Sequence, residues 1–197
     1  MARLRLATAT PRSWVDEVAA SPLELLSDHA HCELKAAASA QSLIARHPRE
    51  RALVVELASI AAEEIAHFSA TVALLHARGG ELDRLARNAY AEALLARAGG
   101  ADALLDRLLV SALIEARSLE RFLLLAEHLA DLELAAFYRS LVASEASHQA
   151  AFLRLAREHA GEDAVRARLA VLVEAEARAL AAAPRGPRMH SGVTDTG

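Results

Sequence analysis

Residues 63–67 read Glu-Glu-Ile-Ala-His, and residues 144–148 read Ser-Glu-Ala-Ser-His. Both stretches contain the pattern Glu-x-x-His, formed by Glu64, His67, Glu145 and His148. On a helix, residues three apart lie on one face about one turn from each other. Each pair therefore offers a carboxylate and an imidazole to the same point in space.

Each pair is preceded by another glutamate at nearly the same distance. Glu33 lies 31 positions before Glu64, and Glu115 lies 30 positions before Glu145. The chain thus contains a degenerate internal repeat, one helical hairpin used twice. These glutamates fall among apolar residues at helical spacing, where core residues are expected. Unpaired carboxylates in a core are costly, so they need a partner.

Composition and the positions of helix breakers predict an all-α protein. Of the 197 residues, 54% are hydrophobic but only 4% aromatic. Ala and Leu, both strong helix formers, dominate the apolar residues. We expect helices at about 21–47, 49–78, 82–98, 102–129, 131–161 and 162–183, followed by a tail at 184–197.

The order of these segments is a hairpin, a long crossover over residues 79–101 and a second hairpin. This connectivity is typical of a ferritin-like four-helix bundle. We therefore predict a single domain over residues 1–197, with its core bundle at about 21–161 and an additional C-terminal helix.

Such a bundle with these side chains predicts a site for two metal ions. Ferritin-like carboxylate proteins supply one Glu from each of two helices and Glu-x-x-His from each of the other two. The expected ligands are Glu33, Glu64, His67, Glu115, Glu145 and His148. Carboxylates with imidazoles suit iron or manganese, and the single cysteine, Cys32, argues against an iron–sulfur cluster. The rival is a buried salt-bridge network, for which too few Lys and Arg face inward.

Net charge and hydropathy argue against a general nucleic-acid binder and against a membrane protein. The formal net charge is −4 and the pI about 6.1, which disfavours a general nucleic-acid binder but leaves room for a local basic patch. No signal-type segment or uninterrupted membrane span of about 20 residues is recognisable. We therefore expect a soluble, cytoplasmic protein, and Cys32 to pack as a small apolar side chain.

Several other side chains near the predicted ligands have weaker signals. We interpret Tyr138 as a core residue in preference to a group beside the metals. Arg117, Ser118 and Glu120 flank Glu115 and could form hydrogen bonds around it. The remaining histidines lack a paired spacing and are expected at the surface or at helix ends; they are His29, His31, His76, His128 and His159.

Five segments make the chain resemble the tRNA isopentenyladenosine hydroxylases, the MiaE family, from about residue 12 to 193. They are DHAHCELKAAASA (28–40), ASIAAEEIAHF (58–68), EARSLERF (115–122), SEASHQAAF (144–152) and RMHSG (188–192). The resemblance implies a diiron monooxygenase that uses dioxygen and an external electron donor. Its substrate would be the isopentenyl group of a (methylthio)isopentenyl-adenosine next to the tRNA anticodon.

The tRNA anticodon loop would then be a partner of a monomer or small homo-oligomer, with no membrane involved. Phosphate contacts are expected from Arg-rich segments in the crossover and the tail. The candidates are Arg84, Arg87, Arg97, Arg185, Arg188 and His190.

Three alternatives stay open. The first is a ferritin-like or rubrerythrin-like protein that stores iron or removes peroxide. The histidine on the last bundle helix, His148, favours oxygen activation over storage, and one cysteine cannot build a rubredoxin domain. The second is a hydroxylase of a lipid or quinone, and the third is a helical interaction domain without metal.

Overall fold

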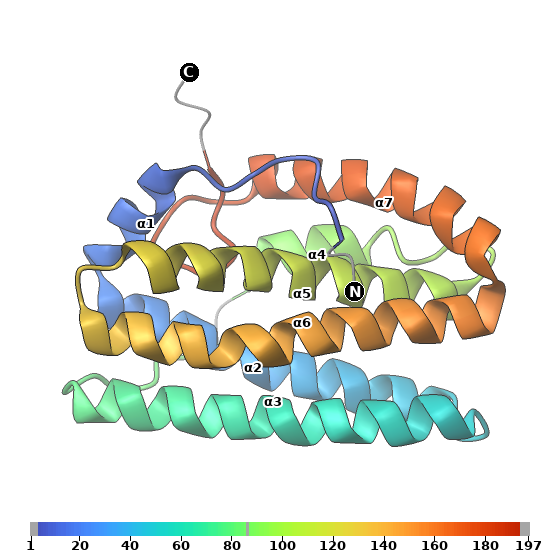
Figure 1. The fold of residues 1–197 in the computed structure, drawn as a ribbon, viewed down its shortest axis with the longest axis horizontal. Helices are drawn as coiled ribbons and strands as arrows, with labels where there is room; N and C mark the ends of the chain where they lie inside the picture. The colour runs from blue at the N-terminus through green and yellow to red at the C-terminus, as the bar shows by residue number, and fades with distance from the viewer. Residues whose placement is uncertain (1–3, 86, 194–197) are drawn as a thin grey trace. The chain divides into compact units, whose positions relative to one another are not determined.

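Helices account for the secondary structure of residues 4–85 and 87–193, which the computed structural model describes (Figure 1). In this part of the chain there is no β-strand. The helices are α1 (Arg12–Ala19), α2 (Pro22–Arg46), α3 (Arg51–Ala77), α4 (Ala89–Leu95), α5 (Ala103–His128), α6 (Leu132–Ala160) and α7 (Glu162–Ala182). The predicted all-α class is confirmed.

The chain forms two compact units. One, the α2–α3 unit, comprises Ala20–Ala86 and Pro187–Met189. The other, the α5–α6 unit, comprises Met1–Ala19, Arg87–Gly186 and His190–Gly197. Each contains one of the two predicted hairpins. The assignment of all 197 residues to one domain stays a prediction.

In the α2–α3 unit the two long helices lie side by side as a hairpin (Figure 1). Pro22 stands in the first turn of α2, where its missing N–H costs nothing. Ser21 takes the predicted N-cap position, but its side chain makes no capping hydrogen bond. α3 ends at Ala77, and Gly79, two residues later, has a φ of 78°, in the left-handed region that glycine adopts without strain.

In the α5–α6 unit the hairpin starts and turns at two capping aspartates. Asp102 accepts a hydrogen bond from Leu105 N at the start of α5, and Asp131 accepts one from Leu134 N at the start of α6. These caps satisfy backbone donors that a helix start leaves unpaired. α1, α4 and α7 pack against this hairpin.

The crossover differs from the prediction of one helix over 82–98, because α4, Ala89–Leu95, is the only helix in its described residues, 79–85 and 87–101. The preceding residues are held to α2 through their backbone. Ser27 Oγ accepts from Asp83 N at 3.0 Å, and His31 Nε2 lies 2.8 Å from Asp83 O. Backbone groups that pair with side chains in this way are not available to a helix ladder.

α1 was not predicted from the sequence. Its eight residues bury Trp14, Val15 and Val18. Trp14 Nε1 donates to Ser191 Oγ at 3.0 Å, and the guanidinium of Arg121 lies 4.4 Å from the centroid of the Trp14 ring. So short a helix is marginal by itself, and these contacts from distant residues stabilise it.

In the described part of the chain, α3 alone is long and apolar enough to cross a membrane by length and composition. The core helix of a water-soluble bundle passes the same test, and α3 carries the buried Glu64 at its centre. The predicted cytoplasmic location stays a prediction.

Candidate metal centre

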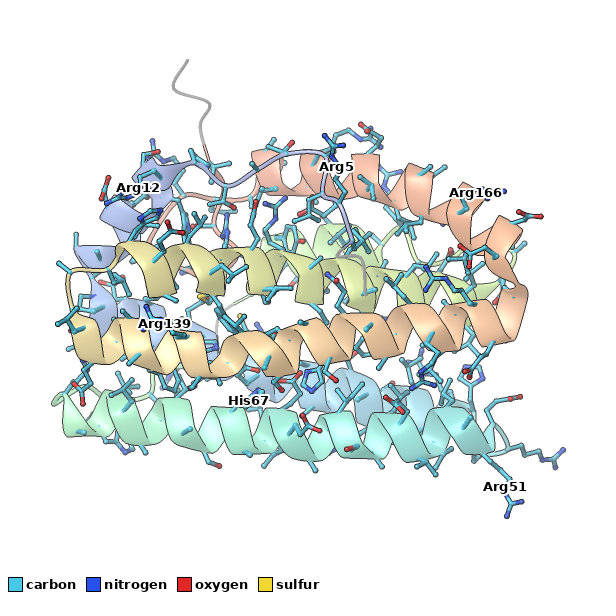
Figure 2. The ribbon with its side chains drawn as sticks, viewed as in Figure 1. Arg5, Arg12, Arg51, His67, Arg139 and Arg166 are labelled. Carbon is cyan, nitrogen blue, oxygen red and sulfur yellow. The ribbon has the colours of Figure 1, made fainter. Side chains whose placement is uncertain are left out.

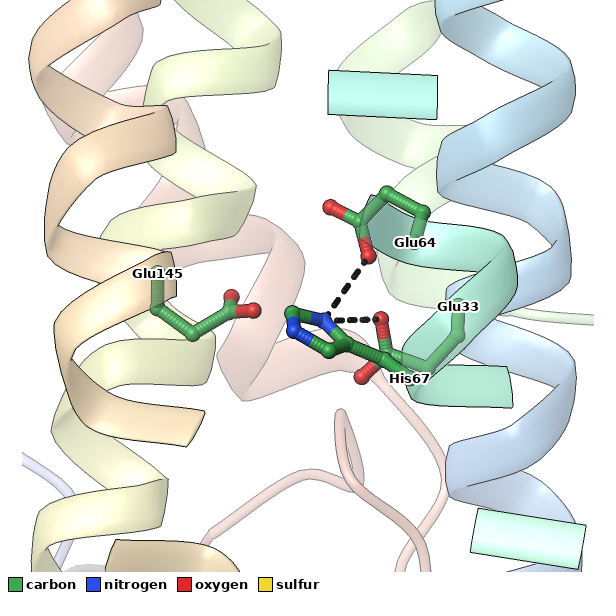
Figure 3. Close-up of side chains that lie close together, drawn as sticks. All are labelled: Glu33, Glu64, His67 and Glu145. Carbon is green, nitrogen blue, oxygen red and sulfur yellow. Dashed lines mark ion pairs between the residues drawn. The ribbon is translucent and has the colours of Figure 1, made fainter. Parts of the chain in front are cut away.

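The α2–α3 unit brings three of the predicted ligands together. One ligand atom each of Glu33, Glu64 and His67 lie within 4.8 Å of one another. Figure 3 shows one ring nitrogen of His67 facing both carboxylates, and this Nδ1 lies 3.8 Å from Glu33 Oε2 and 3.6 Å from Glu64 Oε2. Glu33 and Glu64 are only 5% and 1% exposed, so water scarcely screens their charges.

The electrostatics of this triad, Glu33 with Glu64 and His67, favour a bound cation. Burial and the neighbouring Glu64 raise the pKa of Glu33 well above its ordinary value. Burial lowers the pKa of His67, but Glu33 and Glu64 outweigh this effect and raise it to about 10. Without metal, Glu33 and His67 are therefore the groups of this triad that favour holding a proton. A divalent cation can replace those protons, and carboxylates with an imidazole are a common donor set for iron.

His29 is a fourth member of this cluster that the sequence analysis placed at the surface or a helix end. That placement is wrong, because His29 is 1% exposed and its Nε2 lies 2.5 Å from Glu33 Oε1. Burial, and then the charge of His67, lower the pKa of His29 to about 3. The ring is therefore neutral at ordinary pH, and its Nε2–H can donate to the Glu33 carboxylate once Glu33 is ionised, as a metal ligand is.

His31, predicted like His29 to lie at the surface or a helix end, is also buried, at 8% exposure, and its Nε2 lies 2.8 Å from the Asp83 carbonyl oxygen. The other three histidines of that group, His76, His128 and His159, lie in the last turns of α3, α5 and α6, as expected.

The α5–α6 unit repeats the triad. Glu115 comes from α5 and Glu145 with His148 from α6, and one ligand atom of each lie within 4.8 Å of one another. Their exposed fractions are 6%, 2% and 2%. Each unit thus positions two buried carboxylates and one imidazole, and each cluster has the donor set of a metal site.

Tyr138 belongs to the core of this unit, as expected. It is fully buried, and its ring centroid lies 5.3 Å from that of Phe122.

Residues after Glu115 build a polar network that holds peripheral segments onto α5. Arg117, fully buried, donates from Nε and Nη2 to the buried Glu176 of α7 at 2.9 and 3.0 Å. The Tyr90 hydroxyl donates to the same carboxylate at 2.9 Å. Glu120 accepts from Thr10 N at 3.0 Å. A buried salt bridge therefore exists, but it involves α7 and the N-terminal segment.

The predicted RNA contacts divide into two groups. Arg84, Arg87, Arg97, Arg185 and Arg188 are exposed. His190 is only 6% exposed and stacks on Tyr90 at 4.9 Å between centroids. Its ring nitrogens lie 3.3 Å from Asn88 Nδ2 and 3.3 Å from Ser118 Oγ. His190 thus packs the tail against α4 and α5, a role that the sequence analysis did not predict.

Comparisons with known proteins agree on one family of enzymes. The family described as tRNA-(MS[2]IO[6]A)-hydroxylase (MiaE) matches residues 2–191. A Pseudomonas putida protein named tRNA 2-(methylsulfanyl)-N(6)-isopentenyladenosine(37) hydroxylase is 40% identical over 191 residues, 95% of this chain and 92% of that protein. Its namesake from Salmonella typhimurium is 30% identical, with 95% and 88% covered.

A solved structure extends the similarity to the fold. It is described as Protein 43 with aldehyde deformylating oxygenase activity from Synechococcus. The two share a TM-score of 0.92 and 42% identity, over 98% of this chain and 100% of that one. The predicted ferritin-like fold is thereby confirmed.

Proposed function

Since the chain belongs to the MiaE family of tRNA hydroxylases, we propose that it hydroxylates the isopentenyl group of a (methylthio)isopentenyl-adenosine next to the tRNA anticodon. The observation that carries this proposal is the pair of buried Glu–Glu–His triads, one in each unit, in a chain 40% identical to a tRNA hydroxylase. The RNA target comes from the family, and the oxidative chemistry fits the triads.

The proposed cofactor is a pair of iron ions held jointly by the two triads, with dioxygen as co-substrate. When bound, the irons would supply the activation of dioxygen and insertion of one oxygen atom into a C–H bond, while two electrons from an external donor and two protons convert the other oxygen atom to water. Four carboxylates would offset most of the charge of two such ions, and one imidazole would complete each ligand shell. Manganese suits the same donors, so iron is the finer part of the proposal.

The chain's own side chains would exclude water from the metal site and orient its ligands. Glu64, Glu145 and His148 are each 1–2% exposed, which restricts access of bulk water. His29 would fix the orientation of the Glu33 carboxylate by donating to Oε1, as partners of metal ligands commonly do. The target base would be presented unstacked from a single-stranded loop, the usual mode of sequence-specific RNA recognition.

The iron proposal is tested by metal analysis of protein purified with iron supplied anaerobically. About two irons per chain are expected. Glu64→Ala should abolish binding, whereas Glu63→Ala, an exposed carboxylate next to it, should not. If Glu64→Ala kept both irons, the ligand assignment would be refuted. Retention of one iron would mean that the triads bind metal separately.

The substrate is tested by nucleoside analysis of tRNA from cells that lack the protein. We expect the hydroxylated prenyl-adenosine to disappear and its unhydroxylated precursor to accumulate. Re-expression of the wild-type chain should restore it, and Glu64→Ala should not. An unchanged nucleoside profile would remove the tRNA target and leave the metal site standing.

A second candidate function is aldehyde deformylation, because the 42% identical Synechococcus protein has that activity. Incubation of the iron-loaded protein with a long-chain aldehyde, a reductant and dioxygen tests it. Formate release at a rate exceeding tRNA hydroxylation would favour this function over the RNA target. The proposed tRNA hydroxylase also includes three further expectations. It would need an external electron donor, form a monomer or small homo-oligomer, and work in the cytoplasm.

A further inference from the structure

A pocket lined by three arginines lies on the α5–α6 unit, away from its Glu–Glu–His triad. Its volume is about 330 Å³, and it opens between the segment after α4 and the middle of α7. Arg97 and Gly100 contribute one wall, and Arg168 and Arg178 the other. We call it the arginine pocket.

Arg168, one of the three lining arginines, is neutralised by an ion pair. Its Nε lies 2.5 Å from Asp106 Oδ1 and its Nη2 3.0 Å from Oδ2. Asp106 is only 2% exposed and also accepts from Gly100 N at 2.8 Å. A Cβ on residue 100 would lie 2.9 Å from Asp106 Oδ2, so this close approach favours glycine. Asp106 therefore holds the Arg168 side chain and the Gly100 backbone together beside the pocket.

Arg97 and Arg178 leave the pocket with excess positive charge. Both side chains are exposed, and within the described residues neither guanidinium forms an ion pair with a carboxylate. Arg166, two residues before Arg168 on α7, differs, because it pairs with Asp163 at 2.5 Å. Figure 2 shows Arg166 at the surface of α7. Two such cations around one concavity attract an anion, even in a chain with a net charge of −4.

Two separate guanidiniums favour a chain of phosphates over one small ion. Arg97 follows α4 and Arg178 lies on α7, so the two exposed cations come from different walls of the pocket. Successive phosphates of one nucleic-acid strand can approach both. The planar guanidinium fork pairs with two phosphate oxygens at once, which makes arginine suited to nucleic-acid backbones.

We propose that the arginine pocket binds backbone phosphates of the tRNA substrate, an inference that rests on the proposed function. Asp106, which pairs with the lining Arg168, and Glu115, in the triad, lie on the same helix, nine residues or about 14 Å apart. Phosphates held here position the RNA relative to the triad without contacting the reacting base. Contacts of this kind set register and affinity and carry no sequence information.

The test compares Arg97→Ala, Arg178→Ala and the double variant with Arg166→Ala as the matched control on the same helix. The probe is tRNA carrying the unhydroxylated prenyl-adenosine, isolated from cells that lack the enzyme. Its Kd is measured by fluorescence anisotropy at several salt concentrations with iron-loaded protein. Arg168 is left intact, since its removal would strand the buried Asp106.

The double variant is expected to bind tRNA about tenfold more weakly than the wild type. The slope of the logarithm of the association constant against the logarithm of salt concentration should become smaller by roughly 1 for each phosphate that the variant no longer neutralises. KM for tRNA should rise in parallel while kcat at saturating tRNA stays unchanged. Arg166→Ala should match the wild type in all three quantities.

Wild-type affinity and salt slope in the double variant would overturn the pocket assignment, and so would an equal weakening in Arg166→Ala. Failure of the proposed function has a different signature, in which the iron-loaded wild-type protein itself neither binds nor hydroxylates the tRNA. Circular dichroism and thermal unfolding of each variant establish that it folds.

Discussion

Replacing His29 by Leu tests how the Glu33 ligand is held. Leu keeps the apolar volume of this buried position but removes Nε2, which lies 2.5 Å from Glu33 Oε1, together with the N–H that can donate to the ionised carboxylate. A hydrogen bond to a charged group contributes about 1.5–3 kcal/mol. Loss of such a partner typically weakens metal binding by about 10–100-fold, which corresponds to about 1.4–2.7 kcal/mol. The two estimates agree, so we expect a loss of that size in affinity for the first iron.

The assay is an anaerobic titration of Fe²⁺ against a chromophoric chelator, which measures affinity independently of turnover. His29→Gln provides the conservative variant, because its amide N–H can replace the imidazole donor, and it should stay within about threefold of the wild type. His76→Ala, an exposed histidine in the last turn of α3, is the matched control and should change nothing. If His29→Leu titrated like the wild type, the hydrogen bond would have no part in holding the ligand.

Four further outcomes are expected. Glu115→Ala should remove both irons, as measured by metal analysis, if the two triads act as one site; one remaining iron would contradict this. Arg117→Ala should lower the free energy of unfolding in urea by about 3–5 kcal/mol, because it strands the buried Glu176, whereas the double replacement Arg117→Met with Glu176→Leu should recover most of that loss. His190→Ala should lower the melting temperature by removing the stack on Tyr90 but leave the salt slope of tRNA binding unchanged; a reduced slope would assign His190 to the RNA. The pKa of His29 is lowered to about 3 from an ordinary 6.5, so the unfolded chain binds its proton first. The metal-free protein should therefore lose stability as pH falls from about 6.5 toward 3, a loss that His29→Gln should reduce in urea titrations at pH 7 and 4.5.

The helices and the two triads were accessible from the sequence because their signals are local. Glu64 and His67 share a helix face through their spacing alone, and the same holds for Glu145 and His148. Helix ends followed local breakers equally well, as at Gly79. The boundaries of α2, α3, α5, α6 and α7 accordingly fall within a few residues of those expected.

The segments that the sequence analysis predicted wrongly or missed are held by residues distant in sequence. Trp14 contacts Ser191 and Arg121, and Asp83 contacts Ser27 and His31. The hydrophobic pattern of a window of eight to ten residues cannot predict contacts between residues this far apart in the sequence. The one missed local signal was the four-residue spacing of His29 and Glu33, which places both on one face of α2.

Helix-forming residues, breakers and repeated three-residue spacings follow from short-range backbone geometry, so the chain's primary structure already specified an all-α protein with two acidic, histidine-bearing hairpins. Packing alone decided which polar groups were withdrawn from water. Burial makes the His29 ring neutral and places Arg117 and His190 in contacts that hold distant segments together. The fold also brings the exposed Arg97 and Arg178 to one pocket, where neither has a carboxylate partner among the described residues. The energy of a charge depends on its three-dimensional surroundings, which spacing along the chain does not encode.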